Sequence, residues 1–247
     1  MTIKLVGFDL DDCLFDSTGL SHRARIKGID AMIKLGLDLE REKGIRILDE
    51  IVKEYGSNYS EHYNVFFRRI NHLESSIDHI SYNEQYQYIA AAVMAYHKEK
   101  IDNIQLYGDV IPCFEMLKKK AIKTVIVTDG IPIKQYEKIL RLKINDLVDL
   151  VAISDEIGIR KPNPKLFEYF LNKFGLKGEE TIYVGDRLIN DIKPAIINKI
   201  HAILIHRGGK YDVDVKKADI PEKWAPEFEI SNLNQLFPII DKLNKEK

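Results

Sequence analysis

Short apolar runs alternate with segments of helical period over much of this 247-residue chain. Residues 3–9 are apolar until they end in acidic side chains, which predicts a short buried strand. Further strands are predicted at residues 123–128, 148–153, 181–184, 201–205 and 228–231. Helices are predicted at residues 110–120, 132–140, 164–174, 188–198 and 233–243. Strands that are regularly separated by helices indicate an α/β fold with a Rossmann-like, doubly wound parallel sheet.

Residues 21–101 break this alternation. Four segments of helical period, at residues 21–35, 39–55, 59–73 and 81–101, follow one another with Gly and Asn between them and no predicted strand. A helical insertion of this length is not an ordinary connection between two strands. We therefore expect a core domain of residues 1–16 and 102–247, and a helical cap domain of residues 17–101 that covers the core.

Composition narrows the classes of partner. With 37 Lys and Arg against 38 Asp and Glu, the net charge is −1, so no basic field favours nucleic acid. No apolar run approaches the ~18 residues of a membrane span, and the start of the chain turns acidic too early for a signal peptide. Cys13 and Cys113 are too few for a disulfide framework and lack zinc spacing, which favours the cytoplasm. A homodimer is compatible with the sequence but not required by it.

Polar side chains follow the predicted strands where those strands end. In open parallel sheets, ligands bind outside the carboxyl ends of the strands, at the point where the strand order reverses. The side chains expected there are Asp9 and Asp11, Thr128 with Asp129 and Gly130, Lys161, and Asp186 with Asp191. We therefore expect these clusters to share one pocket.

Asp9 and Asp11 lie two residues apart at the end of the first strand. Like charges this close resist joint ionisation unless a cation compensates, so one can act as an ionised nucleophile while the other holds a proton. The alternative is a pair of acidic residues that solvate a loop, because an Asp-x-Asp pattern alone is common.

Asp186 and Asp191 supply further carboxylates. Carboxylates from two strand ends, with backbone carbonyl and water, form the oxygen shell that Mg²⁺ prefers. For Asp191, helix capping or an ion pair with Arg187 is an almost equal alternative to metal contact.

The remaining clusters match the needs of a phosphate group. The Thr128 hydroxyl and the amides of Asp129 and Gly130 precede a predicted helix, where backbone N–H groups bind phosphate oxygens. Lys161 lies in a proline-fixed loop and offers a point charge to phosphate and to developing transition-state charge. The alternative for Lys161 is an ordinary surface lysine.

Taken in this order, the clusters resemble the haloacid dehalogenase superfamily. The matching stretches are FDLDDCLFDS from Phe8, IVTDG from Ile126, GIRKPNPKLF from Gly158 and VGDRLINDI from Val184. The resemblance covers essentially the whole chain, and the helical insertion stands where that superfamily carries its first type of cap. Cys13 departs from the pattern, which commonly has Thr or Val there, and we interpret it as a small buried packing residue.

The resemblance also implies roles for individual residues. Asp9 becomes the nucleophile and Asp11 the general acid and base. Thr128 and Lys161 become the phosphate ligands, and Lys161 also assists catalysis by neutralising developing charge. The implied Mg²⁺ ligands are the Asp9 side chain, the Asp11 carbonyl and Asp186. Asp191 becomes a supporting residue.

Asp11 separates members of the superfamily. Dehalogenases lack this second Asp, and the phosphonate-cleaving branch has a small residue there, so both are disfavoured. Phosphatases and sugar phosphomutases have both Asp residues. The resemblance therefore implies a phosphomonoester phosphatase that acts on small phosphorylated metabolites through an aspartyl-phosphate intermediate. A phosphomutase, or a non-catalytic phosphometabolite-binding protein, is the alternative.

The cap sequence narrows the resemblance further. The stretches EYGSNYSEHYNVFFRR from Glu54, AYHKEK from Ala95 and TDGIPIKQYEKILRL from Thr128 look like a group of archaeal phosphatases described as acting on glyceraldehyde 3-phosphate. The candidate cap residues for substrate contact are Tyr55, Asn58, Tyr59, His62 and Arg69. Aromatic residues at these positions are also typical of a cap core, and for most of them we favour that interpretation.

Overall fold

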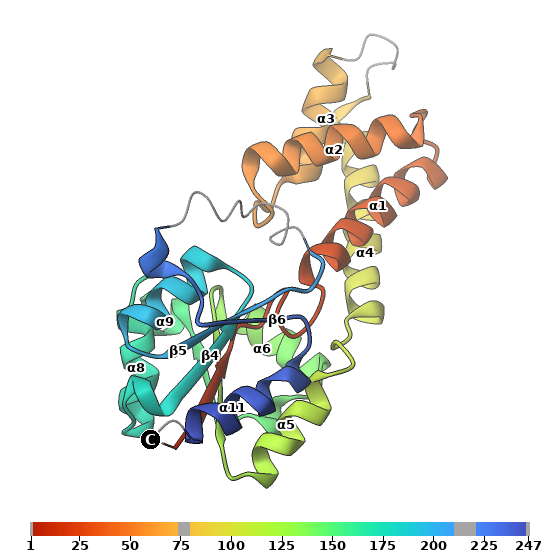
Figure 1. Cartoon of the computed structure of the whole chain (residues 1–247). Helices are drawn as coiled ribbons and strands as arrows, with labels where there is room; N and C mark the ends of the chain where they lie inside the picture. Colours follow the sequence, from red (N-terminus) through yellow and green to blue (C-terminus); the bar gives the residue numbers. More distant parts are fainter. Residues whose placement is uncertain (1, 74–79, 210–220, 246–247) are drawn as a thin grey trace. The chain divides into compact units, whose positions relative to one another are not determined.

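The computed structural model describes residues 2–73, 80–209 and 221–245 (Figure 1). The chain divides into two compact units, and each is described by itself. One unit comprises Met1–Thr18 with Ile104–Lys247, and the other comprises Gly19–Asn103.

A parallel sheet forms the centre of the first unit. Its six strands stand in the order β3-β2-β1-β4-β5-β6. Their bounds are β1 Leu5–Phe8, β2 Lys123–Thr128, β3 Leu150–Ile153, β4 Thr181–Gly185, β5 His201–Ile205 and β6 Phe228–Ile230. All neighbouring strands pair in parallel, which confirms the doubly wound sheet predicted from the alternation of elements.

The central strand β1 fixes where the candidate residues meet. Phe8 pairs in register with Ile126 of β2 on one side and with Val184 of β4 on the other. Between β1 and β4 the order of strands reverses, because the chain leaves β1 towards β2 and β3 and returns to β4. The loops after β1, β2 and β4 therefore emerge together at the switch point of the sheet.

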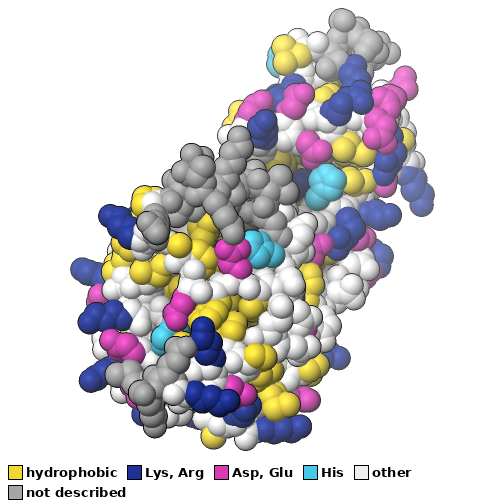
Figure 2. Space-filling view, in the orientation of Figure 1, with side chains coloured by type: hydrophobic (Ala, Val, Ile, Leu, Met, Phe, Trp, Pro, Cys, Tyr) yellow, Lys and Arg dark blue, Asp and Glu magenta, His cyan; other side chains and the backbone are white. Residues whose placement is uncertain are grey.

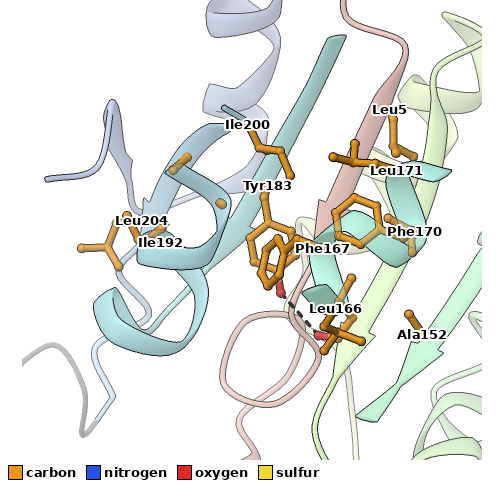
Figure 3. Packing of buried hydrophobic residues seen from close by; sticks show 14 of the residues in the cluster. Leu5, Ala152, Leu166, Phe167, Phe170, Leu171, Tyr183, Ile192, Ile200 and Leu204 are labelled. Atoms are coloured by element: carbon orange, nitrogen blue, oxygen red, sulfur yellow. Dashed lines mark hydrogen bonds between the residues drawn. The ribbon is translucent and has the colours of Figure 1, made fainter. Parts of the chain in front are cut away.

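Helices cover both faces of this sheet. On one face, α8 (Lys165–Phe174) and α9 (Lys193–Ile197) pack on the strands through a buried cluster in which Figure 3 shows the rings of Phe167, Phe170 and Tyr183 side by side. On the other face, α5 (Val110–Lys119) and α11 (Leu236–Lys245) cover the sheet (Figure 1). The Phe8 and Phe114 rings meet there with centroids 5.1 Å apart. The strands are thus buried on both sides, as their continuous apolar sequence requires.

Gly7 makes room for one of these rings. A β-carbon at this position would lie 2.7 Å from Cδ2 of Tyr183, closer than side chains tolerate. The glycine leaves room for the buried tyrosine ring, whose hydroxyl lies 3.4 Å from the carbonyl of Val127 near the end of β2.

The second unit is helical throughout its described residues. Its helices are α1 Ser17–Lys34, α2 Arg41–Tyr55, α3 His62–Leu73 and α4 Tyr82–Asn103. They bury an apolar core that includes Ile29, Leu48, Ile51, Phe66 and Phe67. At the start of α1, Asp12 accepts hydrogen bonds from the N–H and hydroxyl of Thr18, at 2.8 and 2.6 Å, which caps the helix.

Two helical predictions need correction, and one short helix was not predicted. The continuous helix predicted over residues 188–198 is a π-helical turn, Leu188–Ile192, followed by α9. The predicted helix 233–243 opens with a 3₁₀ turn, Leu233–Gln235, and a short helix, α7 (Ser154–Ile157), was not predicted. In the first case Ile192 donates its N–H to the carbonyl of Arg187, five residues back, and Pro194 has no N–H to continue a regular ladder.

The structure shows where the cysteines and the charged side chains lie. Both cysteines are free and buried. Lys and Arg side chains are interspersed with Asp and Glu on the face drawn in Figure 2, in keeping with the balanced charge of the sequence. Among the described helices, none combines the length and the apolarity that crossing a membrane would require.

Candidate active site

Three buried carboxylates meet at the switch point of the sheet. Asp9 follows β1, Asp186 follows β4, and Asp191 lies in the π-helical turn, and at most 6% of each residue is exposed. Each offers a carboxylate oxygen within 4.8 Å of the others. The N–H of Asp9 donates to the carbonyl of Val184 at 3.0 Å, which ties the loop after β1 to β4.

Gly185 permits the close approach of Asp191. A β-carbon on Gly185 would lie 2.4 Å from Cβ of Asp191, so any larger residue would push this carboxylate away. Asp191 also accepts the backbone N–H of Arg187 at 3.1 Å, and it pairs with Lys161 at 2.7 Å. Asp191 thus joins the acidic cluster and accepts a backbone hydrogen bond at the start of its own turn, and its ion pair in the structure is with Lys161.

Lys161 compensates part of this negative charge. Its ammonium group donates to Asp9, to Asp191 and, at 3.3 Å, to the carbonyl of Val127, and its side chain is 4% exposed. Burial opposes the charge, but Asp191 and Asp9 outweigh it and hold the pKa of Lys161 well above its usual value. The backbone N–H of Lys161 donates to Asp129 at 3.1 Å, so Asp129 holds the lysine loop in place.

Among the described residues, Asp186 has no ion pair with Lys161 of the kind that Asp9 and Asp191 have. Neither of its buried carboxylate oxygens has a hydrogen-bond partner among the described residues. Burial, reinforced by Asp9 and Asp191, raises the pKa of Asp186 to about 9, and burial together with Asp191 raises that of Asp9 to about 7 despite Lys161. Three carboxylates against one ammonium leave an excess of negative charge that a cation with oxygen ligands would neutralise. The acidic cluster could therefore bind a metal ion.

Asp11 stands apart from this cluster. Its two carboxylate oxygens accept hydrogen bonds from the Lys138 ammonium at 2.8 and 2.7 Å. Burial opposes ionisation, but the charge and hydrogen bonds of Lys138 outweigh it and lower the pKa of Asp11. The two aspartates of the Asp-x-Asp pattern thus have opposite environments: without a cation, the acidic cluster favours a proton on Asp9, and Lys138 favours the carboxylate form of Asp11.

The phosphate-binding candidates end β2 beside this site. Thr128 is 1% exposed, and its hydroxyl accepts a hydrogen bond from the Gln135 amide at 2.7 Å. Because one lone pair of the oxygen is engaged in this way, the hydroxyl proton is left to donate elsewhere. The Gly130 N–H, predicted to bind phosphate, donates to the Ser154 hydroxyl at 3.0 Å. Thr128 therefore fits the predicted role more directly than Gly130.

Cys13 is fully buried beside the site. Its thiol lies 3.7 Å from the carbonyl of Val184, and burial raises its pKa well above the usual value. A thiol held in this protonated state packs rather than reacts.

The cap candidates lie together in the helical unit. The rings of Tyr55 and Tyr59 have centroids 4.9 Å apart, and those of Tyr59 and His62 are 5.6 Å apart. His62 contacts the Gly56 carbonyl at 2.8 Å, and Asn58 is exposed. These contacts stabilise the turn between α2 and α3.

Arg69, the remaining cap candidate, pairs with two glutamates of α2. Its guanidinium lies 3.3 Å from Glu50 and 2.7 Å from Glu54. In the described structure this guanidinium joins α3 to α2.

Sequence reasoning missed three side chains that contact the site. Gln135 and Lys138 lie three residues apart on α6 (Pro132–Arg141), and Tyr183 places its hydroxyl 3.3 Å from Asp191. The helical spacing of Gln135 and Lys138 directly after Thr128 was the available signal, because residues three apart share a face. The signal for Tyr183 was a hydroxyl-bearing residue inside an apolar strand.

Residues 3–196 match the profile of a family described as haloacid dehalogenase-like hydrolases, and residues 158–236 match a related hydrolase profile. The chain is 39% identical to the glyceraldehyde 3-phosphate phosphatase of Methanopyrus kandleri over 246 residues, which cover 99% of this chain and 100% of the relative. It is 37% identical to the enzyme of the same name from Pyrococcus furiosus, over 98% of this chain and 95% of that one.

Solved structures show the same fold. A putative β-phosphoglucomutase from Thermotoga maritima superposes with a TM-score of 0.69 at 14% identity, covering 97% of this chain and 99% of its own. A phosphatase from Thermococcus onnurineus superposes with a TM-score of 0.62 at 25% identity, covering 97% of this chain and 98% of its own.

Proposed function

This chain belongs to the haloacid dehalogenase-like hydrolase family, and we propose that it is a Mg²⁺-dependent phosphomonoester phosphatase with D-glyceraldehyde 3-phosphate as its best substrate. The substrate is that of full-length relatives that are 34–39% identical to it. The observation that carries the chemistry is the contrast between Asp9, in a buried acidic cluster, and Asp11, held outside it by Lys138. One carboxylate can attack while the other moves a proton.

In the first half-reaction, an Asp9 carboxylate oxygen attacks phosphorus and the bond to the ester oxygen breaks. Asp11 gives a proton to the departing oxygen, and it must first take up that proton, because Lys138 favours its carboxylate form. Thr128 donates to one phosphate oxygen, and the Lys161 ammonium balances charge beside the nucleophile. The products of this step are an alcohol and an aspartyl phosphate.

In the second half-reaction, water attacks the phosphorus of the aspartyl phosphate. Asp11, now a carboxylate, takes the proton of that water, and the bond between phosphorus and Asp9 breaks to release phosphate. The lowered pKa of Asp11 favours this carboxylate form. One residue thus serves both half-reactions.

The orphaned carboxylate of Asp186 supports the Mg²⁺ assignment. Asp9 and Asp186 would hold the ion with the main-chain carbonyl of Asp11, and Asp191 would support them through Lys161. When bound, the ion supplies positive charge to the phosphoryl oxygens.

The helical unit would act as a cap. A cap that closes over a phosphoryl-transfer site excludes bulk water and leaves the water that Asp11 activates. The exposed side chains Tyr55 and Asn58, with the neighbouring Tyr59, His62 and Arg69, are its candidate specificity residues.

Release of inorganic phosphate tests this function. With Mg²⁺, we expect hydrolysis of glyceraldehyde 3-phosphate, of glycerol phosphates and of a chromogenic aryl phosphate, with the highest kcat/KM for glyceraldehyde 3-phosphate. EDTA should remove the activity, and added Mg²⁺ should restore it. Transfer of phosphate to a second sugar hydroxyl, without release, would indicate a phosphomutase. No turnover of any ester would leave a binding protein.

Thermal unfolding provides a second, independent prediction. Because burial raises the pKa of Asp186 to about 9 and that of Asp9 to about 7 from the usual 3.8, the folded metal-free protein holds protons that the unfolded chain releases. The stability of the metal-free protein therefore falls as the pH rises from 3.8, the usual pKa, towards the folded-state pKa values of about 7 and about 9. Bound Mg²⁺ offsets this loss, so the stabilisation by Mg²⁺ should grow with pH.

The expected size follows from mass action. At a Mg²⁺ concentration of 100 times Kd, the stabilisation is about 2.7 kcal/mol, or roughly 5–11 °C in the unfolding midpoint of a chain of this size. We expect this shift at about pH 8 and a much smaller one at about pH 5, measured against EDTA. The variant Asp186→Asn should lose the shift. Equal shifts at both pH values would contradict the assignment of the acidic cluster as the ion site.

A further inference from the structure

One face of α6 contacts two of the proposed catalytic residues. Gln135 and Lys138 lie three residues apart on this helix, which follows Thr128 directly. Lys138 donates to both carboxylate oxygens of Asp11, and Gln135 donates to the Thr128 hydroxyl and to the carbonyl of Asp129, at 2.7 and 2.6 Å. The helix therefore connects the loop after β1 with the loop after β2.

The two lysines of the site serve different carboxylates. Lys161 is almost wholly buried and pairs with Asp9 and Asp191. Lys138 is 22% exposed and pairs with Asp11, whose side chain is 31% exposed. Lys138 thus contacts the carboxylate proposed to move protons.

Asp11 needs such a contact to keep one orientation. A partly exposed aspartate has two rotatable side-chain bonds, and water competes for its oxygens. Lys138 donates to both oxygens, at 2.8 and 2.7 Å. Charge-assisted hydrogen bonds of this kind are stronger than neutral ones, so together they favour a single position of the carboxylate.

We propose that Lys138 is a positioning residue that holds the Asp11 carboxyl group where it meets the ester oxygen of the substrate, and that Gln135 does the same for the Thr128 hydroxyl. This inference rests on the proposed function. It assigns to Lys138 an effect on the proton transfers and none on the attack by Asp9, because Lys138 contacts Asp11 while Lys161 contacts Asp9.

The leaving group of the substrate separates these two effects. An alkyl phosphate releases a strongly basic alkoxide, which needs a proton as it departs. A nitrophenyl phosphate releases a weakly basic phenolate, which departs without one. The ratio kcat/KM reports only the steps up to the first irreversible one, here the departure of this group. A misplaced Asp11 should therefore lower kcat/KM for the alkyl ester and not for the aryl ester.

The test compares Lys138→Met with the unaltered protein on glycerol phosphate and on nitrophenyl phosphate, both with saturating Mg²⁺. Misplacing a catalytic group by about 1 Å lowers rates about 10²-fold. We expect that loss in kcat/KM for glycerol phosphate and less than about a threefold loss for nitrophenyl phosphate. Because Asp11 also activates the water, rapid mixing of the variant with nitrophenyl phosphate should show a burst of nitrophenol followed by a slow steady rate.

Two further variants make the test specific. Lys138→Arg keeps the charge and the reach, so it should recover part of the loss on glycerol phosphate. Lys134→Met removes an exposed lysine from the same helix and should leave both substrates unaffected. Equal unfolding midpoints among the variants would show that α6 is intact.

The outcomes are distinguishable. An equal loss on both substrates, or no loss on either, would overturn the positioning role of Lys138 and leave the proposed phosphatase standing. Absence of turnover in the unaltered protein on every ester would overturn the proposed function and this inference with it. A selective loss on glycerol phosphate with a nitrophenol burst would support both.

Discussion

Replacing Asp9 with asparagine is expected to lower kcat by a factor on the order of 10⁴ or more on every substrate, because the variant lacks the atom that forms the bond to phosphorus. An amide oxygen is a poor nucleophile and carries no charge. Lys161, Thr128 and Asp186 remain in place in the variant, but they stabilise charge around a bond that no longer forms. Substrate binding should survive, so KM or Kd should change much less than kcat.

The fold should tolerate this replacement. Asparagine has the size of aspartate, and Lys161 keeps its contact with Asp191 at 2.7 Å. The replacement also removes one of three carboxylates that crowd a buried site, so the unfolding midpoint without metal should stay equal or rise. Phosphate release and thermal unfolding of the same preparation measure both effects.

A matched control is available at the same end of the sheet. Asp155 lies in α7, directly after β3, and its partly exposed carboxylate pairs with Arg160 at 2.7 Å and accepts the Ser154 hydroxyl at 3.0 Å. Asp155→Asn makes the same chemical change outside the proposed machinery and should keep full activity. Turnover by purified Asp9→Asn at more than about a hundredth of the unaltered rate would rule out Asp9 as the nucleophile.

The sheet could be predicted from the sequence because its strands are buried on both faces. Such strands appear as continuous apolar runs bounded by polar residues, and each of the six predicted strands exists with ends that shift by at most two residues. The parallel arrangement followed from the helices between them. The order of the strands within the sheet could not be read from the apolar runs, since such a run does not specify which strand pairs with it.

Irregular helices could not be predicted in this way. Hydrophobic period gave one helix over residues 188–198, but the structure breaks it into a π-helical turn and α9. The break depends on tertiary contacts, because Asp191 is buried against Gly185 and held by Lys161. Hydrophobic periodicity treats an aspartate as a solvent-facing residue. It therefore does not predict that the buried Asp191 interrupts the helix.

The candidate site was partly predictable for a geometric reason. The rule that parallel strands end at one edge of the sheet indicated that Asp9, Thr128 and Asp186 would meet, and these residues do follow adjacent strands. Lys138 could not be found by this rule, since it contacts Asp11 from a helix 127 residues further along the chain. The spacing of Gln135 and Lys138 placed them on one face of a helix after Thr128, but it did not show that this face meets Asp11.

Replacing Lys161 with methionine is the second large effect that we expect, and it acts on stability as well as on rate. The ammonium is buried against Asp9 and Asp191, so its loss leaves these carboxylates without their positive partner. Breaking a buried ion pair on one side costs about 3–5 kcal/mol, or roughly 6–20 °C in midpoint for a chain of this size. Loss of its charge from the transition state should also lower kcat by about 10²–10³-fold.

The pH dependence distinguishes this cause from simple loss of packing. Without Lys161, which lowers the pKa values of Asp9 and Asp186, these two values rise further, so the folded variant must hold protons that the unfolded chain releases. The destabilisation should therefore be large at about pH 8 in EDTA and much smaller at about pH 5, and Mg²⁺ should reverse much of it at the higher pH. Arg160→Met, which breaks an exposed pair, should cost no more than about 1 kcal/mol at either pH. If Lys161→Met instead lowers the midpoint equally at both pH values, packing by the lysine stem and not charge compensation holds the acidic cluster together.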